Sequence, residues 1–258
     1  MRLRGALLAA ILTAPLIPQS SVTPLQSSLL LFNSGKYGEC YQIVSSYVLS
    51  NPSSGPARKL LGMDEFMLGK RQEALQELQR ATELMPRDTE AFYYLGRLYF
   101  EADNAPAALT AFQKAVELDP SNVRARNNMG QSYEAMGRLL DAERSYLRAI
   151  EVEKGQAKKS GWPSYNLGLL YFNSGRSDRA VSCFREALAS NPGFSEAKIK
   201  LAALLSDENE ARGLLEEAVR SDPQNAEAHY RLALLLTKSG MRDEAQRHFA
   251  LFEKYRKL

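Results

Sequence analysis

Proline recurs along the chain at a nearly constant interval, and this interval restricts the fold more than any other feature of the sequence. Pro52, Pro86 and Pro120 are 34 residues apart, Pro192 follows after 72 residues, and Pro223 follows after a further 31. The longer gap equals two units plus four residues, and the shorter gap equals one unit minus three. A period of this length indicates a repeat protein whose units stack on their neighbours instead of folding around one central core.

Small residues recur in the same register as the prolines. Each unit has one small residue in its first half and one in its second half, and in five units a turn glycine lies between them. Small side chains let packed helices approach closely, and glycine readily adopts the left-handed conformation that ends a helix. The three sets are Ser28, Gly62, Gly96, Gly130, Gly168, Ala202 and Ala233; Gly35, Gly69, Gly137, Gly175 and Gly240; and Cys40, Ala74, Ala108, Ala142, Ala180, Ala211 and Ala245.

This pattern resembles the tetratricopeptide repeat, in seven copies that cover nearly the whole chain from about residue 21. The resemblance implies an all-α fold, a right-handed superhelical solenoid of about seven helix pairs that makes close to one superhelical turn. We expect repeats at about 21-54, 55-88, 89-122, 123-156, 161-194, 195-225 and 226-258. Helix pairs are expected near 22–33/37–50, 57–68/71–84, 89–102/105–118, 123–136/139–152, 163–174/177–190, 195–206/208–221 and 226–239/242–256.

Three units depart from the pattern. The fourth has Lys154 in place of the proline, and the segment 153–161 carries a four-residue insertion of flexible, basic composition. We expect an extended loop between repeats or a longer helix end there. The sixth unit lacks three residues around 206–209, which predicts a shorter turn between its helices. In the third unit Asp103 and Asn104 replace the turn glycine, and asparagine tolerates the left-handed conformation.

The first twenty residues have the layout of a secretory signal. Arg2 and Arg4 precede an uncharged run from Gly5 to Pro18, which is shorter than the ~20 apolar residues of a membrane-spanning helix. No Ala-x-Ala cleavage motif stands at the expected place. The segment 1-20 therefore favours a cleaved signal and a periplasmic or secreted protein. The alternative is a cytoplasmic protein, or one anchored in the inner membrane by this segment if it is not cleaved.

Charge and composition disfavour several classes of function. Thirty-three Lys and Arg against thirty Asp and Glu give a net charge of +3, too small for the whole molecule to bind a polyanion. Two Cys and two His are too few for the usual four-ligand zinc site. No phosphate-binding loop, zinc-protease motif or nucleophile elbow occurs. We therefore expect no enzymatic activity, no cofactor, no metal and no nucleic-acid partner.

The few reactive side chains are interpreted as structural. Cys40 and Cys183 lie four repeats apart, too far for a disulfide, and are expected to be small buried hydrophobic residues. His229 and His248 both fall in the last unit and are expected to pack or to be solvated.

Candidate binding residues come from the first helix of each pair, because the resemblance implies that these helices line the concave groove. The side chains outside the stacking core are aromatic, amide or positively charged, and aromatic and arginine side chains often anchor protein interfaces. An asparagine can pair with a peptide unit through one donor and one acceptor. The candidates are Tyr93, Tyr94, Arg97, Arg124, Asn127, Asn128, Gln131, Trp162, Tyr165, Asn166, Tyr230 and Arg231.

The best-known site of the family clamps an acidic carboxyl-terminal peptide with Lys and Asn side chains from successive first helices. Lys59 occupies the lysine position, but Met63 stands where asparagine is needed, and Arg124 and Asn128 do not restore the pair. We therefore do not predict this clamp.

The sequence predicts a non-enzymatic adaptor or scaffold that binds a protein or peptide partner of unknown identity in its concave groove. Two alternatives remain open. One is a self-associating module that dimerises through the last repeat, where Phe249, Phe252 and Tyr255 lie. The other is an assembly subunit of an envelope complex, without a free peptide ligand.

Overall fold

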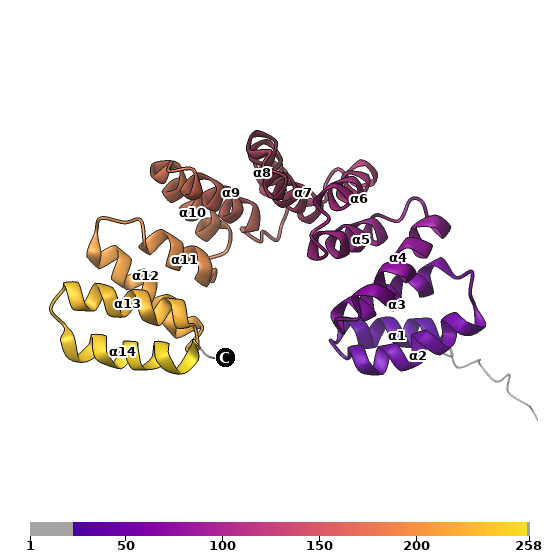
Figure 1. Cartoon of the computed structure of the whole chain (residues 1–258), viewed down its shortest axis with the longest axis horizontal. Coiled ribbons are helices and arrows are strands. Elements are labelled where there is room, and N and C mark those ends of the chain that lie inside the picture. Colours follow the sequence, from indigo (N-terminus) through magenta and orange to yellow (C-terminus); the bar gives the residue numbers. More distant parts are fainter. Residues whose placement is uncertain (1–22, 257–258) are drawn as a thin grey trace, which may run out of the picture.

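The computed structural model describes residues 23–256, and this range contains fourteen helices and no strand. Consecutive helices pair into seven hairpins arranged as an arch (Figure 1), which confirms the predicted all-α solenoid. The helices are α1 (Pro24–Asn33), α2 (Tyr37–Ser50), α3 (Gly55–Met67), α4 (Arg71–Leu84), α5 (Thr89–Glu101), α6 (Ala105–Leu118), α7 (Val123–Ala135), α8 (Leu139–Lys154), α9 (Trp162–Asn173), α10 (Ser177–Ser190), α11 (Ser195–Ala202), α12 (Glu208–Ser221), α13 (Ala226–Lys238) and α14 (Arg242–Tyr255).

Contacts between hairpins are made with the next hairpin along the chain. Each second helix packs on the first helix of the following hairpin, and several successive first helices also touch directly, as α5 touches α7 and α7 touches α9. The first and last hairpins therefore lie at the two ends of the arch (Figure 1). In such a fold the stability of each hairpin depends on its own packing and on its two neighbours.

The turn residues end the first helices as predicted. The five turn glycines have φ angles between 71° and 80°, the left-handed conformation that glycine adopts without strain. In the third hairpin the left-handed residue is Asp103, with φ of 57°, and not Asn104. Asn104 caps α6 instead, because its side-chain oxygen accepts a hydrogen bond from the backbone N–H of Ala107.

In four hairpins the small residue of the first helix is a glycine that faces a large side chain from the second helix of the same hairpin. A Cβ atom at Gly96 would lie 2.6 Å from a ring carbon of Phe112, and the Phe112 ring is fully buried. The close approach is therefore between a helix backbone and a side chain, and not only between two backbones. Equivalent pairs are Gly62 with Leu78, Gly130 with Tyr146, and Gly168 with Phe184.

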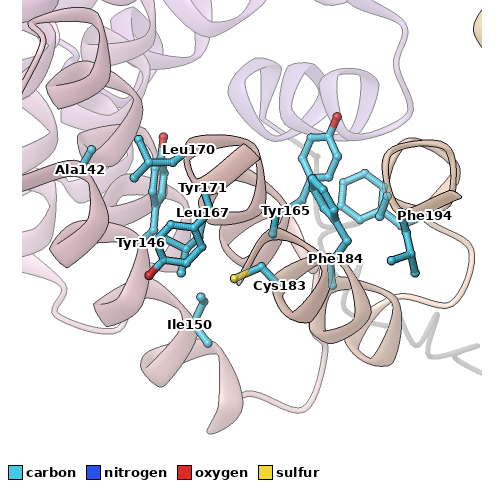
Figure 2. Close-up of a cluster of buried hydrophobic side chains, with 14 residues drawn as sticks. Ala142, Tyr146, Ile150, Tyr165, Leu167, Leu170, Tyr171, Cys183, Phe184 and Phe194 are labelled. Carbon is cyan, nitrogen blue, oxygen red and sulfur yellow. The ribbon is translucent and has the colours of Figure 1, made fainter. Parts of the chain in front are cut away.

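The core continues from one hairpin into the next. Figure 2 shows Tyr146 of α8 beside Leu167 and Leu170 of α9, while Phe184 of α10 lies near Tyr165. Cys40 and Cys183 are buried and unpaired, as predicted. Burial is the main cause that raises the pKa of Cys40 to about 12 and that of Cys183 to about 11, so neither thiol is a ready nucleophile.

Most helix ends lie within two residues of the predicted bounds; in the fourth unit the structure has both a longer helix end and an extended loop, and in the sixth unit the predicted shorter turn is wrong. The helix α8 continues to Lys154, and the insertion forms a loop over residues 155–161. The missing residues of the sixth unit shorten the helix α11, which ends at Ala202, whereas the turn after it has five residues instead of the three found in the other hairpins. The start of α12 is fixed by its cap, because Asp207 accepts hydrogen bonds from the backbone N–H groups of Asn209 and Glu210. With three residues fewer in the unit, α11 ends earlier and the chain between Ala202 and this cap is extended.

The signal-like segment 1-20 lies outside the described residues. Within residues 23–256, no helix combines the length and the apolar character that crossing a membrane requires.

The second hairpin buries two carboxyl groups that lack hydrogen-bond partners. Asp64 is fully buried, and Glu65 is 4% exposed. Neither carboxylate oxygen of Asp64 nor Oε2 of Glu65 has a partner in residues 23–256; Cys40 lies beside Asp64 without hydrogen-bond geometry. Burial raises the pKa of Asp64 to about 6, and burial with the nearby Glu77 and Glu73 raises that of Glu65 to about 7. These two groups therefore destabilise the hairpin at neutral pH.

Replacing the buried carboxyl group should stabilise the protein in a pH-dependent way. The pKa of Asp64 is higher in the folded than in the unfolded chain, so its charge costs little below pH 3.8 and costs most above pH 6. Leucine is the residue at the equivalent position 98 of α5 and 170 of α9. Asp64→Leu should raise the free energy of unfolding by roughly 2–3 kcal/mol at pH 7.5 and by much less at pH 4. Urea denaturation followed by circular dichroism measures both values.

The matched control is Glu83→Gln, which removes an exposed carboxylate from the same hairpin and should change stability little at either pH. A gain from Asp64→Leu that is equal at pH 4 and pH 7.5 would show that the charge of Asp64 is not the cause.

The contact between glycine and ring can be tested at Gly130. Gly130→Ala adds a methyl group that overlaps the buried ring of Tyr146, and we expect a loss of about 1–3 kcal/mol in unfolding free energy. The control is Gly38→Ala in α2, where an added Cβ has no neighbour within 4 Å. This control should gain about 0.5–1 kcal/mol through helix propensity. Thermal or urea unfolding of both variants measures the difference, and equal effects would contradict the packing argument.

Candidate functional site

A pocket of about 480 Å³ opens on the first helices of three consecutive hairpins. Its walls come from α5, α7 and the start of α9, with Ser160 contributed by the insertion. Figure 1 shows α5 and α7 on the inner side of the arch, with α6 and α8 outside them. The lining residues are Tyr93, Arg97, Phe100, Glu101, Val123, Arg124, Asn127, Asn128, Gln131, Ser160, Trp162, Pro163 and Asn166.

The pocket brings together eight of the twelve candidate residues, although they lie as far apart in the sequence as 93 and 166. They point to one space because the first helices of adjacent hairpins run side by side and equivalent positions face the same way. These eight are Tyr93, Arg97, Arg124, Asn127, Asn128, Gln131, Trp162 and Asn166.

The other four candidates lie elsewhere. Tyr94 packs in the core near Phe66, and Tyr165 is buried in the cluster of Figure 2, so both rings serve packing. Tyr230 lies at the far end of the arch against Phe249 and Phe252 of α14. Arg231 pairs with Glu227 at 2.9 Å and lines a separate pocket of the last two hairpins.

Five lining residues were not among the twelve candidates: Phe100, Glu101, Val123, Ser160 and Pro163. Glu101 follows Arg97 by one helical turn, so the spacing of α5 could have indicated it. Ser160 belongs to the insertion, which has no counterpart in the other repeats and thus no register from which to place it.

Buried amides connect α7 to α9 at the base of the pocket. Asn127 and Asn166 are 7% and 6% exposed, and Nδ2 of Asn166 donates a hydrogen bond of 2.9 Å to Oδ1 of Asn127. Nδ2 of Asn127 in turn donates to Oδ1 of Asn128 at 3.3 Å. In residues 23–256 this leaves Oδ1 of Asn166 and Nδ2 of Asn128 without side-chain partners. The chain of amides therefore retains an acceptor at Asn166 and a donor group at Asn128 for a ligand.

Aromatic and positively charged side chains form the rest of the wall. The guanidinium of Arg97 lies 4.4 Å from the centre of the Phe66 ring, and that of Arg124 lies 4.7 Å from the centre of the Tyr93 ring. Trp162 is 46% exposed and packs edge-on against Phe194. Stacking holds these long side chains in place while part of each still faces the solvent.

The two arginines differ in their acidic neighbours. Arg97 lies 3.9 Å from Glu101, whose carboxylate is also paired with Arg71 at 3.0 Å. Arg124 has no carboxylate within 4 Å in the described part of the chain. Arg124 is thus the cation of the pocket that remains available to an anionic group.

Lys59, the residue at the position of the family's clamp lysine, is paired with two carboxylates of its own chain. Its Nζ donates to Asp88 at 2.9 Å and to Glu90 at 3.1 Å. Burial alone would lower the pKa of Lys59, but these two carboxylates raise it above its ordinary value. An ammonium held in this way is consistent with the prediction that the clamp is not formed.

The histidines of the last repeat pack against each other. His229 is 2% exposed, and its Nδ1 lies 2.8 Å from Nδ1 of His248, while its Nε2 lies 3.1 Å from the carbonyl oxygen of Pro223. Between residues 23 and 256, no group of three or more His, Cys, Asp or Glu side chains is placed to hold a metal ion.

Three family models match successive parts of the chain. A TPR repeat model matches residues 96–137, and two tetratricopeptide repeat models match residues 122–192 and 205–252. Together they span more than half of the sequence. A search of curated proteins found no match.

Solved structures share the fold at low sequence identity. A chain of the APC/C hetero-tetramer Cut9-Hcn1 is 18% identical, with a TM-score of 0.68 over 91% of this chain, and the match spans only 46% of that chain. The pilF protein of Pseudomonas aeruginosa is 22% identical, with a TM-score of 0.66 over 78% of this chain and 90% of its own. YrrB, described as a TPR protein with an unusual peptide-binding site, is 20% identical, with a TM-score of 0.51 over 69% of this chain and 91% of its own.

Identities this low show the fold alone, but the family models identify the repeats by sequence. The chain belongs to the tetratricopeptide repeat family.

Proposed function

We propose that the protein is a non-enzymatic adaptor that binds an extended segment of a partner protein in the pocket on α5, α7 and α9. Repeats of this family generally act as protein-interaction modules without enzymatic activity. YrrB, which shares the fold, is described as having a peptide-binding site. The proposal for this chain rests on its own pocket.

The chain of buried amides is the observation that supports peptide binding most directly. A peptide unit offers one N–H donor and one C=O acceptor, and the free oxygen of Asn166 and the free amino group of Asn128 supply the complementary pair. The hydrogen bond between Asn127 and Asn166 fixes these groups before a ligand arrives, so little side-chain entropy is lost on binding. Contacts of this kind hold a segment whatever its side chains are.

The aromatic wall supplies the apolar part of the contact. Trp162, Tyr93 and Phe100 line the same pocket as the amides. A volume of about 480 Å³ accommodates a few side chains, not a folded domain. We therefore infer that the ligand is a short linear segment with at least one aromatic or large aliphatic residue.

Removal of the amide pair or the exposed indole should weaken peptide binding. A library of random 12-residue peptides displayed on phage provides the probe, and a selected peptide is then measured by fluorescence anisotropy. We expect Asn166→Ala and Trp162→Ala each to weaken binding about tenfold or more, because each removes a contact worth about 1–2 kcal/mol. Trp162 is exposed on one side, so its variant should fold normally.

The matched control is Asn173→Ala, which removes an exposed amide at the end of the same helix outside the pocket. Unchanged affinity in both Asn166→Ala and Trp162→Ala would refute the proposed site. Light scattering of the wild-type chain at rising concentration separates the alternative of a homodimer through Tyr230, Phe249 and Phe252, an aromatic cluster on the last hairpin.

We also propose that the chain is exported, on the basis of the signal-like layout of residues 1-20. Amino-terminal sequencing of the native protein would support this if the chain began near residue 21.

A further inference from the structure

The insertion is held in one conformation by a buried carboxylate. Glu153 at the end of α8 is 4% exposed; its Oε1 accepts hydrogen bonds from the N–H and hydroxyl of Ser160 at 2.9 and 2.6 Å, and its Oε2 accepts from the N–H of Gly161 at 3.3 Å. Gly161 has φ of 76°, and a Cβ there would lie 2.7 Å from the carbonyl oxygen of Ala187. Only glycine fits this position.

Two further hydrogen bonds connect the insertion to neighbouring hairpins. The side chain of Gln156 donates to the carbonyl oxygen of Ser121 at 2.9 Å, and that of Asn191 donates to the carbonyl oxygen of Ser160 at 3.4 Å. These hydrogen bonds fix residues 155–161 as part of the pocket wall, and this part has no counterpart in the other repeats.

A second cavity of about 310 Å³ lies between this loop and the turn before α7. It shares Val123, Arg124 and Ser160 with the pocket of the proposed function, so the two cavities meet at these residues. Lys158 of the loop lines the second cavity. The insertion thus extends the pocket beyond the first helices and adds a cation to it.

The acidic groups of the two cavities are already engaged. Oδ1 of Asp119 accepts hydrogen bonds from the N–H and hydroxyl of Ser121, Glu153 holds the loop, and Glu101 is paired with Arg71. In contrast, neither Arg124 nor Lys158 has a carboxylate within 4 Å in residues 23–256. Asp119 and Glu153 keep their negative charge, but neutral N–H and hydroxyl groups already occupy the oxygens named above, so this end of the site presents two cations without a direct carboxylate partner.

We propose that the second cavity is an anion subsite of the peptide pocket, in which Arg124 and Lys158 bind the side-chain carboxylate of an Asp or Glu in the ligand segment. This inference rests on the proposed function, because the acidic residue belongs to the same segment whose aromatic residue lies in the first pocket. The specificity for an acidic residue then comes from the insertion and from Arg124 at the junction. The small net charge of +3 favours a peptide over a nucleic acid as the anionic ligand.

The test is selection of the random 12-residue phage library on the full-length chain and on charge-reversal variants. We expect the wild type to enrich Asp or Glu at a fixed spacing from an aromatic residue. Arg124→Glu and Lys158→Glu should lose this acidic preference while the aromatic preference persists. Lys159→Glu is the matched control, because Lys159 is exposed, adjoins Lys158 and lines neither cavity.

A selected peptide then allows a double-mutant cycle. Replacement of its acidic residue by the neutral amide should weaken binding to the wild type about twofold to fivefold, the range of a partly exposed ion pair. The same replacement should weaken binding less in Arg124→Gln, which keeps Lys158, and should leave binding unchanged in the double variant Arg124→Gln/Lys158→Gln.

The outcomes separate this inference from the proposed function. Aromatic enrichment without any acidic preference would overturn the anion subsite and leave peptide binding in place. An acidic preference that survives both Arg124→Glu and Lys158→Glu would also overturn it. Failure to enrich any peptide would overturn both proposals, and tight binding of a single-stranded 12-nucleotide DNA that falls steeply with salt would replace the peptide ligand with a nucleic acid.

Discussion

The solenoid depends on one repeated contact, in which a large side chain of the second helix of a hairpin packs on a glycine of the first helix. In each of four consecutive hairpins a Leu, Phe or Tyr of the second helix covers a glycine of the first, which sets how closely the two helices approach. A small buried alanine or cysteine of the second helix then leaves room for the neighbouring hairpin. Because these contacts repeat, the first helices align, and residues 30 to 40 positions apart face one space.

Much of this arrangement could be predicted from the sequence because it is periodic. The spacing of glycine and alanine gave the hairpins and most helix ends, and the same register gathered Arg97, Asn128 and Asn166 into one pocket. The register could not tell which aromatic residues face the groove: Tyr93 and Tyr165 occupy equivalent positions, yet only Tyr93 lines the pocket, whereas Tyr165 packs between Phe184 and Phe194. That choice depends on the neighbouring side chains, which vary between repeats.

The conformation of the insertion could not be predicted from the repeat pattern. Its conformation depends on one carboxylate, Glu153, and on contacts to Ser121 and Asn191 that are more than thirty positions from the groups they bind. No local pattern encodes such contacts. Yet this departure from the repeat is what makes the middle of the arch different from its ends, because it adds Ser160 to the pocket and places Lys158 on a cavity that Arg124 also lines. A regular groove offers similar contacts along its length, so an extended ligand could bind it in several registers. An irregular segment such as this insertion favours one register over the others.

Because each hairpin packs only on its neighbours, the solenoid can tolerate the buried carboxyl groups of Asp64 and Glu65 in one place and carry a binding pocket in another. In a globular core, two unpartnered acids would weaken the whole domain, whereas here their cost falls on the second hairpin and, through Asp64 beside Cys40, on its contact with the first. The amide pair of Asn127 and Asn166 lies between the fourth and fifth hairpins, with intact packing around Phe112, Tyr146 and Phe184 on either side. Opening at the amino-terminal end of the arch therefore need not disturb the geometry on which binding depends. The destabilising carboxyl groups and the pocket lie in different hairpins, so the effect of a change at Asp64 on stability can be separated from an effect on the site.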